Sequence, residues 1–65
     1  MTKIYHLNRT WNLEEREGGW AFVNRKSGYE RLYRTRSSVL QALQAHHIDP
    51  PPEVRKQIEA LPESR

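Results

Sequence analysis

Aromatic and aliphatic residues fill positions 20–24 (WAFVN), and apolar and charged residues alternate over positions 29–34 (YERLYR). Because the side chains of a strand point alternately to its two faces, both segments are predicted to be strands. The residues between them, RKSG, end in Gly28, which can adopt the positive φ that closes short loops. The sequence therefore predicts a β-hairpin over residues 20–34.

The length of this loop determines which residues of the two strands face each other. With the loop at 25–28, one face of the hairpin is aromatic with one arginine, and the other is aliphatic with charged edges. The expected cross-strand pairs are Trp20 with Tyr33, Ala21 with Leu32, Phe22 with Arg31, and Val23 with Glu30.

Two segments precede the hairpin. Residues 3–8, KIYHLN, mix β-branched and aromatic side chains and predict a short strand. Residues 9–17, RTWNLEERE, leave two alternatives open, because Trp11 and Leu13 alternate as in a strand whereas LEERE is rich in helix-forming residues. The glycine pair that follows predicts a turn.

The second half of the chain has helical spacing. Residues 35–48, TRSSVLQALQAHHI, predict a helix with Thr35 or Ser37 as its N-cap. The sequence DPPP, 49–52, ends this helix, because a residue before proline avoids the helical region. The apolar side of the helix is expected to consist of Val39, Leu40, Leu43 and His47.

A second helix is predicted to open at Asp49 or at a following proline, because proline is tolerated in a first helical turn, and to continue through EVRKQIEAL, 53–61. Val54, Ile58 and Leu61 recur at helical spacing and form a narrow apolar stripe along it.

This order of elements predicts an α+β fold. We expect a small antiparallel sheet of three to four strands, followed by a helix packed on one face and a second short C-terminal helix. Residues 1–62 are expected to form a single domain, and residues 63–65 a frayed tail. A sheet that is covered on one face leaves the other in water, and a partner is expected to bind there.

Composition constrains the stability and the location of the protein. A chain of 65 residues that is 35% hydrophobic has a small core, so oligomerisation or docking onto a larger protein would suit it. The absence of cysteine excludes disulfides and thiolate metal sites. No apolar run approaches the ~18 residues of a membrane span, and the segment MTKIYHLNRT has no signal-peptide core. We therefore expect a cytoplasmic protein, encoded by a cell, a phage or a plasmid.

The charge of the chain is positive and uneven. The net charge is +3, with eight basic and four acidic residues in positions 1–36 and three basic and four acidic residues in positions 37–65. A basic first half favours an anionic partner because it raises the local potential. A net charge of this size is also ordinary for a small soluble protein.

Nothing in the sequence indicates catalysis or metal binding. His46 and His47 are adjacent and would point about 100° apart on a helix, which is a poor geometry for a metal site. Glu14, Glu15 and Glu17 are neighbouring acids in an exposed segment, and no glycine motif for phosphate binding is present. We therefore expect a non-enzymatic protein without a metal, cofactor or small-molecule substrate.

The basic hairpin and the start of the following helix form the best candidate site. Arginine binds phosphate bidentately, and arginine and tyrosine both stack on bases. The segment TRSS, 35–38, could also hold a phosphate at the free N–H groups of a helix N-terminus. The candidate nucleic-acid-binding residues are Trp20, Arg25, Lys26, Tyr29, Arg31, Tyr33, Arg34 and Arg36.

A protein partner is the alternative that the sequence leaves open. It would contact an exposed aromatic patch, or the apolar stripe Val54, Ile58 and Leu61. A helix-turn-helix over residues 37–61 is less well supported, because its second helix would begin with PPEV, whose first residues are poor at reading bases.

Residues 20–43, WAFVNRKSGYERLYRTRSSVLQAL, resemble the AP2-like integrase arm-binding domains. The resemblance consists of a tryptophan strand, a basic turn with glycine, a second strand, and a threonine before an amphipathic helix. It implies that the sheet enters the DNA major groove, with Trp20, Arg25, Arg31 and Arg34 touching bases and phosphates. Residues 9–17 and the proline-linked second helix depart from that pattern.

Overall fold

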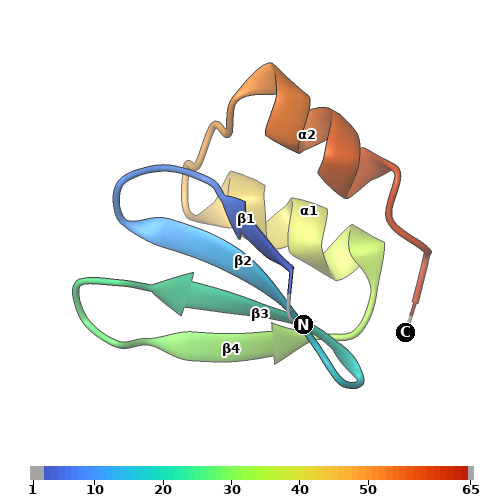
Figure 1. Ribbon diagram of the computed structural model, residues 1–65, viewed down its shortest axis with the longest axis horizontal. Coiled ribbons are helices and arrows are strands. Elements are labelled where there is room, and N and C mark those ends of the chain that lie inside the picture. Colours follow the sequence, from blue (N-terminus) through green and yellow to red (C-terminus); the bar gives the residue numbers. More distant parts are fainter. Residues whose placement is uncertain (1–2, 65) are drawn as a thin grey trace.

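A computed structural model describes residues 3–64 of the chain. Four antiparallel strands form one sheet in the order β1-β2-β3-β4, and two helices follow (Figure 1). The predicted α+β fold is therefore confirmed. The elements are β1 (Ile4–His6), β2 (Trp11–Arg16), β3 (Gly19–Asn24), β4 (Glu30–Tyr33), α1 (Arg36–Ala45) and α2 (Pro52–Glu59).

The ambiguous segment 9–17 contains the strand β2, which pairs with β1 on one side and β3 on the other. Leu13 is fully buried at the centre of the sheet, opposite Tyr5 and Phe22. Tertiary burial of this alternating residue outweighs the helix propensity of the glutamates around it. A tight turn at Gly18, where φ is 84°, joins β2 to β3.

The hairpin of β3 and β4 has the predicted register. All four expected pairs are present: Trp20 with Tyr33, Ala21 with Leu32, Phe22 with Arg31, and Val23 with Glu30. Gly28 has a φ of 78°, as its place at the end of the loop requires.

Both helices lie on the same side of the sheet, as Figure 1 shows. The side chains enclosed between the sheet and the helices form one core, and Trp20 and Phe22 are its largest fully buried members. The core comprises Tyr5, Leu7, Leu13, Trp20, Phe22, Val39, Ala42, Leu43, Ile48, Ile58 and Leu61.

Helix α1 begins at the predicted N-cap and ends before the predicted end. The Oγ1 atom of Thr35 accepts a hydrogen bond of 3.1 Å from the backbone N–H of Ser38. Val39 and Leu43 are buried as expected, and Ala42 joins them. His47, which we expected on the apolar side, is exposed and has a φ of 55°, because the chain has already left the helix there.

Helix α2 packs its apolar stripe into the core. Pro52 stands in its first turn, as predicted, and Ile58 and Leu61 are buried while Val54 is partly buried against them. The expectation that these three residues form a protein-binding stripe is therefore wrong, because the sheet and α1 already cover them.

The C-terminal segment is bound to the start of α1 rather than frayed. The backbone N–H of Arg36 donates to the carbonyl of Glu63 at 2.9 Å, and Thr35 forms an antiparallel bridge with Ser64. The predicted fraying of residues 63–65 is thus wrong for Glu63 and Ser64, and Arg65 lies outside the described residues.

We predict that Ile58→Ala lowers the free energy of unfolding by about 2–5 kcal/mol, because it leaves a cavity where α2 meets the core. Urea denaturation of the purified protein measures this loss. Gln57→Ala changes an exposed neighbour on the same helix and should stay within about 0.5 kcal/mol of the parent. Equal stabilities of the two variants would show that α2 does not dock as described.

Candidate nucleic-acid interface

The structure divides the predicted binding residues among separate surfaces. Trp20 has no exposed surface, because α1 and α2 cover the face of the sheet on which it lies. Its ring therefore cannot stack on a base, and its assignment as a nucleic-acid contact is wrong. Tyr33 lies opposite Trp20 at the edge of the same face and is partly buried.

Arg36 serves the fold and not an open surface. One of its guanidinium nitrogens, Nη1, donates to the carbonyl of Leu61 at 2.9 Å, and Nη2 lies 3.9 Å from a carboxylate oxygen of Glu63. The expected phosphate site at TRSS is also occupied by the protein itself, because the backbone N–H groups of Arg36 and Ser38 already donate to Glu63 and Thr35.

The uncovered face of the sheet carries carboxylates. The Arg16 guanidinium bridges Glu14 at 2.8 Å and Glu30 at 2.7 Å across three strands. A hydrogen bond with Glu14, followed in size of effect by one with Glu30, raises the pKa of Arg16 above its ordinary value. The Arg16 guanidinium therefore stays charged. We expected a partner to bind a basic surface on this uncovered face, but the face carries two carboxylates, Glu14 and Glu30, bridged by one arginine.

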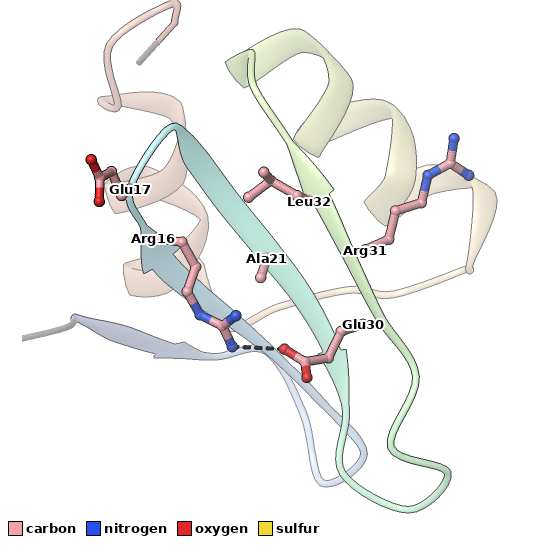
Figure 2. A pocket seen from close by; sticks show the side chains of 6 residues that line it. All are labelled: Arg16, Glu17, Ala21, Glu30, Arg31 and Leu32. Atoms are coloured by element: carbon pink, nitrogen blue, oxygen red, sulfur yellow. Dashed lines mark hydrogen bonds and ion pairs between the residues drawn. The ribbon is translucent and has the colours of Figure 1, made fainter.

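Apolar side chains surround this bridge. Ile4 and Leu32 are each 45% exposed, and both lie in one row across the sheet with Glu14 and Ala21. A shallow hollow of about 500 Å³ lies over Ala21 and Leu32 of this row. Figure 2 shows Arg16, Glu30, Ala21 and Leu32 around it, and shows the Arg31 side chain extending away from the Arg16–Glu30 pair.

Two loops meet at the end of the sheet where β1 joins β2 and β3 joins β4. The Asn8 side chain accepts hydrogen bonds of 2.8 Å from the backbone N–H groups of Thr10 and Trp11. In the second loop, the Asn24 side chain accepts from the N–H groups of residues 26 and 27 at 2.9 and 3.0 Å. These local bonds hold each loop in one shape.

Arg25 joins the two loops. Its backbone N–H donates to the carbonyl of Thr10 at 2.7 Å, and its guanidinium Nη2 donates to the carbonyl of Arg9. Arg9, Arg25 and Lys26 are exposed and lie on these two adjoining loops, so their positive charges gather at one end of the molecule.

Three rings lie beside these cations. The centroid of Trp11 is 4.8 Å from His46 and 5.9 Å from Tyr29, and Tyr29 is 6.5 Å from His46. Trp11 is half-buried, whereas Tyr29 is 42% exposed and His46 is exposed. Phe22 supports Trp11 and His46 from the core, at 5.3 and 5.8 Å. We call the set Arg9, Trp11, Arg25, Lys26, Tyr29 and His46 the aromatic–cationic end.

The charges of this end are not neutralised. Within residues 3–64, Arg9, Arg25 and Lys26 form no ion pair, whereas Arg16, Arg36 and Arg55 each pair with a carboxylate. The potential around the end is therefore positive.

The β4 strand extends this surface beside α1. Tyr29, directly before β4, alternates with Arg31 and Tyr33 of β4, and the three share the face turned toward the helices. The Arg31 guanidinium lies 5.3 Å from the Tyr33 ring centroid. A shallow groove of about 350 Å³ runs between this strand and α1, lined by Arg31, Tyr33, Gln41 and Ala45 among others. Arg34 comes after the end of β4, at the opposite end of the strand from the loops.

Trp11, His46 and Arg9 were not predicted as site residues. They come from two distant segments, residues 9–11 and the end of α1, and only the pairing of Trp11 with Asn24 and the packing of α1 bring them to the β3–β4 loop. The alternation of Trp11 with Leu13 was the one local signal that Trp11 belongs to a strand.

Comparisons with known proteins give no further guide: no family model, curated protein or solved structure matches the chain. No helix within residues 3–64 is long and apolar enough to cross a membrane. In the same residues, no cluster of three or more histidine and acidic side chains could hold a metal ion.

We predict that iodide quenches part of the tryptophan fluorescence and that caesium quenches it less. Trp11 is half-buried beside three cations, which attract the anion, whereas Trp20 is inaccessible. Stern–Volmer titrations measure both effects, and Trp11→Phe should abolish most of the iodide quenching. Stronger quenching by caesium, or unchanged quenching in the variant, would contradict the geometry of this end.

Proposed function

We propose that the protein is a small, non-enzymatic nucleic-acid-binding module that uses its aromatic–cationic end. The observation that supports this most directly is the cluster of Trp11, Tyr29 and His46, whose accessible rings lie beside unpaired cations. Guanidinium and ammonium groups bind phosphate, and accessible aromatic rings stack on bases. Each loop is held by its own asparagine, so binding would order few additional residues.

The proposal keeps part of the predicted site and moves its centre. Arg25, Lys26 and Tyr29 stay in it, and Arg31 and Tyr33 flank it along β4. Trp20 and Arg36 leave it, because the fold uses both of them. Arg34 lies at the far end of β4 and outside the proposed surface.

We predict that Arg9→Ala/Lys26→Ala weakens binding to labelled DNA and RNA and lowers the slope of log K against log salt by about 2. Each lost phosphate contact removes about 0.9 from that slope on duplex DNA, and about 0.7 on a single strand, through counterion release. Neither side chain has a hydrogen bond or an ion pair within residues 3–64, so the variant should fold normally. Fluorescence anisotropy over a range of KCl concentrations measures the slope.

The matched control is Lys3→Ala/Lys56→Ala. It also removes two positive charges, one directly before β1 and one on α2. It should leave the slope within about 0.5 of the parent, since long-range effects of exposed charges are screened. Salt-independent binding, or no binding to either polymer, would reject the proposed function.

Self-association through the uncovered face of the sheet is a second candidate role. Ile4 and Leu32 expose large apolar surfaces in one row there, and Arg16 stands between two carboxylates. A two-fold arrangement could bury both apolar side chains and place the arginine of one copy near the acids of the other.

We predict that, in this case, sedimentation equilibrium shows a dimer whose dissociation constant rises at least tenfold in Leu32→Asp. Gln57→Asp adds the same charge on the exposed side of α2 and should leave the dimer unchanged. A chain that stays monomeric up to millimolar concentration would exclude this role.

A further inference from the structure

We infer that the nucleic acid bound at the aromatic–cationic end is single-stranded, an inference that rests on the proposed function. The resemblance to arm-binding domains implies the opposite, which is a sheet inserted into the groove of duplex DNA. Which of the two substrates fits depends on which side chains each surface presents.

The uncovered face does not suit a duplex. Of the two broad faces of the described sheet, it is the one that the helices leave free, and it presents Glu14 and Glu30 together with exposed Ile4 and Leu32. Carboxylates at this position would face the phosphates of a groove, and like charges repel. The single arginine there, Arg16, is already bound to both acids.

The residues assigned to groove contacts are not on this face. Arg31 lies on the helix side of the sheet, over Tyr33, and Trp20 is enclosed in the core. Arg25 is in the loop at one end of the hairpin, and Arg34 follows β4 at the other end. A duplex laid on the sheet could not contact these groups together.

The rings of the aromatic–cationic end are suited to unstacked bases. Their planes meet at 42° for Trp11 and His46, 81° for Trp11 and Tyr29, and 58° for Tyr29 and His46. No pair of these three is stacked flat, although His46 is stacked on Phe22 from the core at 27°. Bases in a duplex already stack on their neighbours, whereas the bases of a single strand are free to stack on such rings.

The surface also offers a path for a single backbone. From the loop cations it continues along Tyr29, Arg31 and Tyr33, a span of about 13 Å at the rise of a strand. Helix α1 and the two histidines that follow it contain no acid, so these segments do not repel a phosphate. A groove with cations at intervals and rings between them is the arrangement that binds single strands with little sequence preference.

The test compares three probes of equal length: labelled single-stranded DNA, labelled single-stranded RNA, and a DNA duplex. We expect anisotropy titrations to show at least tenfold tighter binding of one or both single strands than of the duplex. Tyr29→Ala should weaken single-strand binding roughly 5- to 150-fold, as expected for the loss of one stacked base, while Tyr29→Phe should retain it.

Leu32→Ala is the matched control, since Leu32 is similarly exposed but lies on the uncovered face, and it should bind like the parent. Equal or tighter binding of the duplex would overturn this inference and leave the proposed function standing. Binding to none of the three probes would defeat both. Equal loss in Tyr29→Ala and Tyr29→Phe, with both variants folded by circular dichroism, would show that the ring does not stack.

Discussion

Burial of Trp20 and Phe22 beneath the two helices is the interaction on which the rest of the structure depends. Each ring has no exposed surface, and a buried aromatic of this size removes about 150–250 Å² from water, worth roughly 4–6 kcal/mol. The indole Nε1 of Trp20 has no hydrogen-bond partner among the described residues, at a cost of about 1–3 kcal/mol. The apolar term is the larger one, so the ring stays inside.

This burial determines which side of the sheet can meet a partner. Side chains that alternate with Trp20 and Phe22 must point to the uncovered side, which places Glu14, Glu30 and Arg16 together there. Trp11 and Tyr29 remain accessible where the helical cover ends, at the last turn of α1 beside the loops. The aromatic–cationic end is thus a consequence of the length of α1, which stops at Ala45 and leaves His46 beside Trp11 and Tyr29.

The hairpin register could be predicted from the sequence because the loop length and the period of two fix it without tertiary information. The cap at Thr35 and the positive φ of Gly28 follow from local chemistry in the same way. The sequence could not predict in this way which face of the sheet the helices cover, because both faces of the hairpin contain apolar residues. Only the packing of Val39, Leu43 and Ile58 onto the Trp20 face decides it.

The predicted site failed at Trp20 and Arg36 for one shared reason. A short chain without cysteine has few side chains with which to build its core and fix its C-terminal segment, and it uses these large ones. Arg36 holds the carbonyl of Leu61 and thereby ties the end of α2 to the start of α1. Residue type alone therefore overstates a binding surface in so small a protein, since the fold itself uses Trp20 and Arg36.

Positive and negative side chains lie on different surfaces of the molecule, and this separation supports the proposed function. Unpaired cations occupy the loop end, and the bridged acids occupy the uncovered face. A polyanion that approaches this molecule is attracted to one surface and repelled from the other, so the charge pattern orients it before any ring makes contact. The cations of the aromatic–cationic end would then orient the polyanion, and its rings would retain the bases by stacking. Neither step requires an enclosed pocket, which a core this small could not form.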